Sequence, residues 1–235
     1  MYLRKTLIIV FLILLADQIS KIYVKTHFQL EESVEVFSWF RISFIENPGA
    51  AWGTKLSDIL PISERTGKLL LTLFRLVAIG GIGYWLWDLI RKGANNYLRV
   101  AVSLIFAGAV GNIIDSLFYG LIFNHSVGQV ATFMAEDNYG GLFYGKVVDM
   151  LYFPMVDTTW PDWVPGVGGN RFRFFAPVFN IADTAISTGV GILLVFNKRA
   201  FAKPDPAETQ TETAMAQAQE AAPEGPESGE AAKPE

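Results

Sequence analysis

The chain has 235 residues, of which 51% are hydrophobic and only 18% are charged. This composition is too apolar for a typical soluble domain and is typical of a protein that crosses a membrane several times. The absence of cysteine excludes disulfides, a thiol nucleophile and cysteine metal ligands. His27 and His125 do not have the spacing of a zinc site, and no basic patch suggests nucleic acid. We therefore predict no cofactor, no metal and no nucleic-acid partner.

The first apolar stretch, residues 6–24, follows the basic pair Arg4 and Lys5. A basic start before an apolar stretch is also the pattern of a secretory signal peptide. No small-x-small cleavage site follows the stretch, so we interpret it as an uncleaved membrane helix. Asp17 and Lys21 lie four positions apart within it, share one helix face and can form a structural ion pair.

A polar segment, residues 25–68, comes next. Its stretch Ser33–Ile45 is rich in β-branched and aromatic residues with partial alternation, and Asn47-Pro48-Gly49 follows it. This pattern predicts a short strand or two outside the membrane. Residues 69–90 are apolar and long enough for a second span. Arg75 lies within that span, where its side chain is expected to snorkel or to face the bundle interior.

Two further apolar stretches, residues 100–119 and 176–197, predict a third and a fourth span. The segment between them, residues 120–175, is aromatic and glycine-rich and too polar to span. The tail, residues 204–235, carries eight acids and one lysine and has no apolar period, which predicts disorder. We assign residues 1–203 to one membrane domain.

Basic residues cluster at three places, namely 4–5, 91–99 and 198–203. With four spans these places lie on one side of the membrane, which the positive-inside rule identifies as the cytoplasm. Both termini are then cytoplasmic, and the two long segments, 25–68 and 120–175, lie outside.

This topology places four acids at the outer membrane boundary: Asp17, Asp115, Asp149 and Asp183. Asn112 precedes Asp115, and Asn180 precedes Asp183, by three positions each, so each pair shares a helix face. An amide can donate to a carboxylate and fix its rotamer. Two carboxylates held close together share a proton, which is the arrangement in aspartic proteases.

Each acid also has a structural interpretation when taken alone. Asp115 could be a helix-terminal group, Asp149 a loop acid and Asp183 a helix cap, and residues 47–51 could form a plain turn. At the level of function, a small proton-coupled transporter would also use membrane acids. Transporters place such acids near the midplane and have inverted repeats, whereas these acids lie at one surface and no repeat is visible. A purely structural scaffold would not explain the paired amides and acids.

Five stretches stand in a fixed order along the chain: Asp17-Gln18-Ile19-Ser20-Lys21, Asn47-Pro48-Gly49-Ala50-Ala51, Gly111-Asn112-Ile113-Ile114-Asp115, Val147-Val148-Asp149-Met150 and Phe179-Asn180-Ile181-Ala182-Asp183. Together they resemble the motifs of the bacterial lipoprotein signal peptidases, also called signal peptidase II, which are membrane aspartyl endopeptidases. The resemblance extends over residues 6–199 and leaves out the tail.

The resemblance implies an all-α membrane protein with four transmembrane helices and a small extracytoplasmic β-cradle, which we place at residues 33–45. It implies a catalytic dyad of Asp149 and Asp183, and a fold stabilised by Asp17 and Lys21. Site-supporting or substrate-binding roles fall to Asn47, Gly49, Asn112, Asp115 and Asn180. The expected partners are membrane lipid and prolipoproteins carrying diacylglyceryl on a cysteine, cleaved just before that cysteine. The expected location is the bacterial cytoplasmic (inner) membrane, with the site on its extracytoplasmic face.

Two features depart from the family pattern. Ser116 stands where the family has arginine, and Arg171 or Arg173 is a candidate replacement. The outer segment 120–175 is longer than the family usually has and could form a lid or a docking surface. The insertion affects the assignment of Asp149 most, and Asp115 is the next candidate for the dyad.

Overall fold

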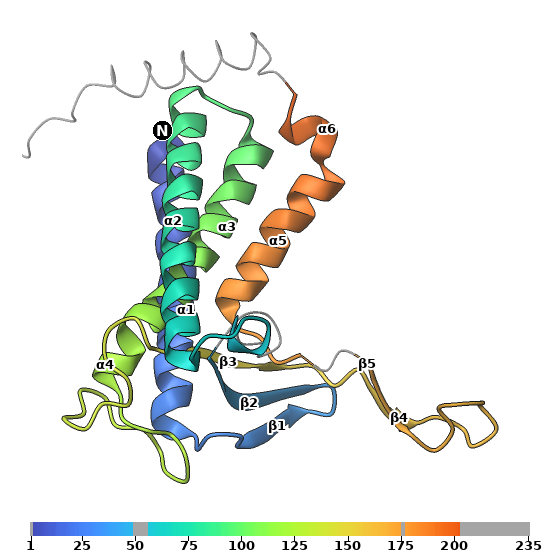
Figure 1. The fold of residues 1–235 in the computed structure, drawn as a ribbon. Helices are drawn as coiled ribbons and strands as arrows, with labels where there is room; N and C mark the ends of the chain where they lie inside the picture. The colour runs from blue at the N-terminus through green and yellow to red at the C-terminus, as the bar shows by residue number, and fades with distance from the viewer. Residues whose placement is uncertain (1, 49–55, 175–176, 203–235) are drawn as a thin grey trace, which may run out of the picture.

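The computed structural model describes residues 2–48, 56–174 and 177–202. Four helices form the body of the molecule and a small sheet lies across one end of them, which we call the cradle end (Figure 1). The helices are α1 (Tyr2–His27), α2 (Glu64–Arg91), α3 (Asn96–Ile114) and α5 (Ile181–Val195). α3 continues through a π-helical turn (Asp115–Tyr119) into α4 (Gly120–Ile122), a short 3₁₀ turn (Leu56–Asp58) precedes α2, and α6 (Asn197–Ala200) follows α5.

Within the part of the chain that the structure describes, three helical segments are long and apolar enough to cross a membrane: Tyr2–His27, Glu64–Arg91 and Asn96–Ile122. Large apolar side chains stand exposed along the first two, for example Phe11 at 62% and Val77 at 77%. Such surfaces are stable in lipid and not in water, so the chain is an integral membrane protein. α5 is also apolar but has only 15 residues, so the fourth predicted span is shorter than the other three.

Capping residues determine where two of the helices begin, and hydropathy alone does not predict these positions. Ser63 caps α2 by accepting a hydrogen bond from Thr66 N at 3.1 Å, so α2 begins before the apolar stretch does. The predicted fourth span was placed from residue 176, but α5 begins only at Ile181 because Asn180 caps it. The residue before that cap, Phe179, is extended and pairs with Leu151 of the sheet.

The sheet is antiparallel with the order β1-β2-β3, formed by β1 (Ser33–Phe37), β2 (Phe40–Asn47) and β3 (Val147–Tyr152). The predicted strands within residues 33–45 are therefore confirmed. β3 was not predicted as a strand, and it places Asp149 opposite Ile45 of β2.

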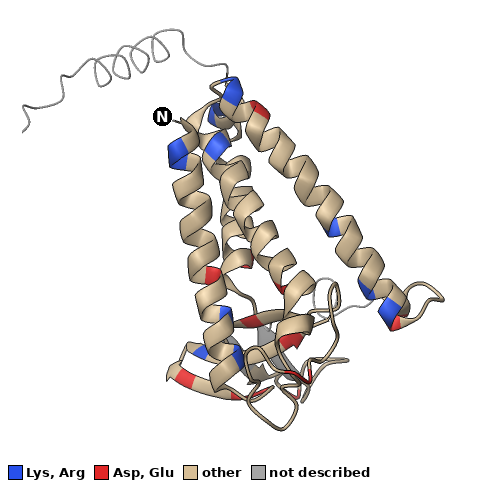
Figure 2. Ribbon diagram, turned by 90° about the vertical axis from the view of Figure 1, so that its left-hand side faces the viewer, with Lys and Arg blue, Asp and Glu red and all other residues tan. Residues whose placement is uncertain are grey.

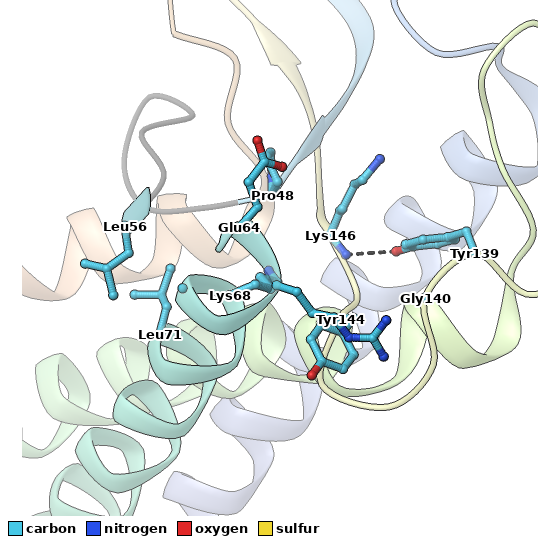
Figure 3. Close-up of a pocket in the computed structure, with 11 residues that line it drawn as sticks. Pro48, Leu56, Glu64, Lys68, Leu71, Tyr139, Gly140, Tyr144 and Lys146 are labelled. Carbon is cyan, nitrogen blue, oxygen red and sulfur yellow. Dashed lines mark hydrogen bonds between the residues drawn. The ribbon is translucent and has the colours of Figure 1, made fainter. Parts of the chain in front are cut away.

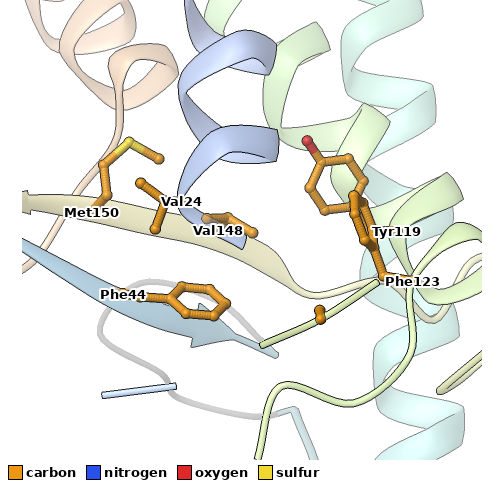
Figure 4. Packing of buried hydrophobic residues seen from close by; sticks show 7 residues of the cluster. Val24, Phe44, Tyr119, Phe123, Val148 and Met150 are labelled. Atoms are coloured by element: carbon orange, nitrogen blue, oxygen red, sulfur yellow. The ribbon is translucent and has the colours of Figure 1, made fainter. Parts of the chain in front are cut away.

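A buried apolar cluster joins the sheet to the helices (Figure 4). It combines side chains from α1, both long strands, the π-helical turn and the following loop: Val24, Phe44, Tyr119, Phe123, Ala131, Val148 and Met150. The first part of segment 120–175 is thus a component of the core. A later part forms a hairpin of β4 (Val156–Thr159) and β5 (Arg171–Phe174), which extends away from the bundle (Figure 1).

Candidate active site

A cavity of about 550 Å³ lies between α2, α3 and α5 beneath the sheet. Asp149 and Asp183 both line it, although they come from different elements. Asn47 and Asn112 also reach the cavity, and its apolar wall includes Ala78, Ile79, Ile82, Ala109 and Ile186. A mostly apolar concavity with a few convergent polar groups has the character of a binding site.

Asp149 lies on β3 with only 4% of its surface exposed. Its two carboxylate oxygens accept hydrogen bonds from Asn180 Nδ2 at 2.7 Å and from Asn47 Nδ2 at 3.4 Å. Burial and, to a smaller extent, the nearby charge of Asp183 together raise the pKa of Asp149 to about 7, against the opposing effect of the bonds from Asn47 and Asn180. Asp149 can therefore hold a proton near neutral pH.

Asp183 lies in the first turn of α5, where it forms a capping box with Asn180. Asn180 Oδ1 accepts from the backbone N of Asp183 at 2.9 Å, and Asp183 Oδ2 accepts from the backbone N of Asn180 at 3.3 Å. The other carboxylate oxygen of Asp183 accepts from Asn112 Nδ2 at 2.8 Å. The two bonds to its oxygens fix the orientation of the carboxylate in the cavity.

The two amides connect the acids. Asn180 is fully buried, and its Nδ2 lies 2.7 Å from Asp149 and 3.1 Å from Asn112 Oδ1. Each asparagine side chain thus donates to an acid on another element: Asn112 to Asp183, and Asn180 to Asp149. Asn180 and Asp183 contact each other in the capping box, but the side-chain donations of both amides cross between elements.

Behind the site, Lys21 joins two buried acids. Its Nζ lies 2.9 Å from Asp17 and 2.9 Å from Asp115, and all three side chains are fully buried. Lys21 also donates to Asn112 Oδ1 at 2.8 Å, which orients this amide towards Asp183. Asp17 further accepts from the backbone N of Ala182 at 2.9 Å, so α1 holds the first turn of α5 in place.

Asp115 contacts β3 and other buried groups. Besides Lys21, it accepts from Gln18 Nε2 at 3.0 Å and from the backbone N of Val148 at 3.2 Å. Asp115 is not one of the described residues that line the cavity. It therefore anchors the strand that carries Asp149, and its geometry is that of a supporting group.

The end of β2 is fixed by a second ionic cluster. Glu46 pairs with Lys25 of α1 and lies 2.8 Å from Lys146 Nζ. Burial opposes ionisation of Glu46, but the two lysines outweigh this effect and hold its pKa below the usual range. Because Asn47 follows Glu46 directly, the cluster also positions the amide that donates to Asp149.

Arg75 is the cavity residue whose role was not predicted from the sequence. It lines the same cavity as the two acids, within electrostatic range of both Asp183 and Asp149. Arg171 and Arg173, the candidates for the missing family arginine, belong to the separate β4–β5 sheet. Ser116 is buried and donates to Asn112 O at 3.2 Å. Gly49, an expected site residue, lies outside the described residues, as does the tail.

Comparison with known proteins shows which family the chain belongs to. The model of the family described as Signal peptidase (SPase) II matches residues 9–198. The chain belongs to the signal peptidase II family. A lipoprotein signal peptidase from Porphyromonas gingivalis is 47% identical over 189 residues, which is 80% of each chain. One from Amoebophilus asiaticus is 35% identical, over 82% of this chain and 76% of the relative. As a member of this family, the chain is a hydrolase, and more specifically a protease that acts in lipoprotein processing.

The fold is shared with solved structures described as bacterial membrane enzymes. One matches with a TM-score of 0.52 at 24% identity, over 86% of this chain and 92% of the other. A second matches with a TM-score of 0.50 at 25% identity, over 81% and 90%. The helical bundle with its small sheet is therefore an arrangement that this signal peptidase II chain shares with solved membrane enzymes.

Proposed function

We propose that this protein is a membrane aspartyl endopeptidase that removes the signal peptide from diacylglyceryl-modified prolipoproteins, cleaving just before the lipidated cysteine. One observation carries the proposal: two carboxylates from different elements, Asp149 and Asp183, line one cavity and are each held by an asparagine amide. Two such carboxylates, one buried and one partly exposed, can provide an acid and a base at the same pH.

We assign the shared proton to Asp149, because its raised pKa of about 7 lets this carboxyl hold a proton near neutral pH. Ionised Asp183 takes a proton from water as the water oxygen attacks the scissile carbonyl carbon. Asp149 gives its proton to the carbonyl oxygen, which produces a gem-diol. Asp183 then gives its proton to the cysteine nitrogen and the C–N bond breaks. Asp149 recovers its proton from the gem-diol, so both acids return to their starting state.

The charge distribution supports an orientation. Basic side chains gather at the end of the bundle opposite the sheet, near the first residue and around the loops (Figure 2). They are Arg4, Lys5, Arg91, Lys92, Lys198 and Arg199. With α5 as a fourth span, the positive-inside rule puts this end and both termini in the cytoplasm of a bacterium. The cradle end then faces outward from the inner membrane, where the lipid anchor of a precursor would hold the scissile bond.

The substrate assignment is tested with purified protein in lipid nanodiscs. The probes are a prolipoprotein carrying diacylglyceryl on its cysteine and the same precursor with that cysteine replaced by serine. We expect cleavage of the lipidated precursor alone, with mass spectrometry placing the cut before the cysteine. Equal cleavage of both precursors would contradict the lipid requirement, and cleavage of neither would contradict the peptidase assignment.

Arg75 is expected to set the upper pH limit of activity. Its positive charge favours the ionised forms of both acids, so the Arg75→Gln variant should raise the pKa of Asp149. The alkaline limb of the kcat/KM profile should then move up by about half a pH unit to one unit. Arg91→Gln, at the far end of the same helix, is the matched control and should leave the limb in place. A profile that is identical in Arg75→Gln and wild type would show that Arg75 does not act on the acids.

A further inference from the structure

A second concavity, of about 250 Å³, lies beside the active-site cavity at the cradle end of α2 (Figure 3). Its described lining comes from the first turns of α2 and from the loop before β3, and shares no residue with the active-site cavity. Three of the lining residues are cationic: Arg65, Lys68 and Lys146. The one acid in the lining, Glu64, is exposed.

Lys68 is the unusual member of this group. Its Nζ is shielded from solvent and has no hydrogen-bond partner among the residues that the structure describes. The nearby cations Arg75 and Lys146 repel the charge of Lys68. The carboxylate of Asp115 attracts it. By contrast, Lys21 has Asp17 and Asp115, and Lys25 has Glu46. A buried ammonium without an acceptor is costly, and an anion in the concavity would remove that cost.

Arg65 and Lys146 each have hydrogen-bond donors that can bind a ligand. The guanidinium of Arg65 stacks on Tyr144, 4.4 Å from the ring centroid, which fixes its position at the rim. Lys146 Nζ binds Glu46 at 2.8 Å and is one-third exposed, so it retains donors for a ligand. Three cationic groups around one small concavity are suited to a phosphate, which offers several acceptor oxygens.

The location selects the class of anion. Arg65 and Lys68 lie in the first two turns of a helix long enough to span a membrane, which puts them at the level of lipid head groups. Leu56 and Leu71 line the concavity, and Leu70 and Phe74 stand exposed just beyond it on α2. A lipid bound there would have cations around its head group and apolar protein surface along its acyl tails.

We propose that this concavity binds the phosphate group of an anionic membrane lipid, with Lys68 as its principal contact. The lipid would fill the space beside the active-site cavity as a resident ligand. This role is independent of the peptidase mechanism, since none of the three cations lines the cavity that contains Asp149 and Asp183.

The test measures lipid binding to the full chain by native mass spectrometry in a neutral detergent. The probes are dioleoylphosphatidylglycerol, dioleoylphosphatidylcholine and inorganic phosphate. We expect the anionic lipid to bind wild type, and Lys68→Gln to weaken this binding about tenfold, as for loss of a charge-assisted hydrogen bond. Lys92→Gln, which removes an exposed lysine at the other end of α2, should change binding by less than about twofold.

Several results would overturn the proposal. An equal loss of lipid binding in Lys68→Gln and Lys92→Gln would mean that any positive charge on the protein is sufficient for binding. Equal binding of the zwitterionic and anionic lipids would remove the charge requirement. Saturation of the site by inorganic phosphate alone would assign it to a free anion instead of a lipid.

A stability measurement separates a binding role from a structural one. In neutral detergent without anionic lipid, Lys68→Met should melt no lower than wild type, because it removes an uncompensated buried charge. On addition of dioleoylphosphatidylglycerol, wild type should gain thermal stability and Lys68→Met should not. A variant that melts lower than wild type without lipid, or gains as much as wild type with it, would contradict the assignment.

Discussion

Asp149→Asn and Asp183→Asn are each expected to lower kcat/KM for a lipidated precursor by about 1,000-fold or more, since each removes one half of the proposed acid–base pair. The asparagine side chain is nearly isosteric with aspartate but can neither accept nor supply the proton at the pH of the assay. Initial rates of precursor cleavage in nanodiscs measure the loss. Asp115→Asn should keep partial activity, because Asp115 supports β3.

A fold control distinguishes lost chemistry from lost structure. The folded-state pKa of Asp149, about 7, lies above its unfolded value, so ionisation costs stability as pH rises between the two. Asp149→Asn removes that cost and should stabilise the protein at pH 8 by about 1–3 kcal/mol, with no gain at pH 4. Thermal melts at both pH values test this. Full activity in Asp149→Asn together with an inactive Asp115→Asn would move the dyad to Asp115 and Asp183.

The second large effect is expected at Lys21. Lys21→Met leaves Asp17 and Asp115 buried without their counter-ion, which should destabilise the fold by about 3–5 kcal/mol. A lowered melting temperature in detergent measures the loss. The double variant Lys21→Met, Asp115→Asn should recover part of it, because one buried charge is gone.

The matched control for Lys21 is Lys92→Met. Lys92 is 71% exposed and pairs with Asp88 on the surface of α2, so its loss should cost less than about 1 kcal/mol. If Lys21→Met and Lys92→Met melt alike, the buried triad does not hold the bundle together. If the double variant is less stable than Lys21→Met, Asp115 contributes through Val148 and Gln18 more than through Lys21.

The helices were predictable because each needs a long apolar stretch, which a single sequence displays directly. The i, i+4 spacing of Asp17 and Lys21 likewise follows from helix geometry, and Lys21 lies 2.9 Å from Asp17. β3 was not predictable on the same basis. Its six residues gain their structure from pairing with β2, about 100 positions earlier, and such long-range pairing leaves little local signal.

The roles of Asn112 and Arg75 depend on neighbours that the sequence does not specify. Asn112 shares a helix face with Asp115, yet it donates to Asp183, because the close approach of α3 and α5 brings that carboxylate nearer. This approach requires Gly108, where a side chain would meet the backbone oxygen of Ala182 at 2.3 Å. From the sequence, Arg75 is a charge within a span whose partners are not specified, and only the folded structure places it in one cavity with Asp149 of β3 and Asp183 of α5.

The shortness of α5 has a consequence for the surrounding bilayer. Its 15 residues extend about 22 Å, while the hydrocarbon core of a membrane is about 30 Å thick. Asp183 stands at one end of this helix, and Lys198 and Arg199 follow at the other. As the proposed fourth span, α5 would require the lipids beside it to thin or tilt, a hydrophobic mismatch that would draw head groups and water inwards on this side. We expect the acids to gain access to water at a depth where a uniform bilayer would be dry.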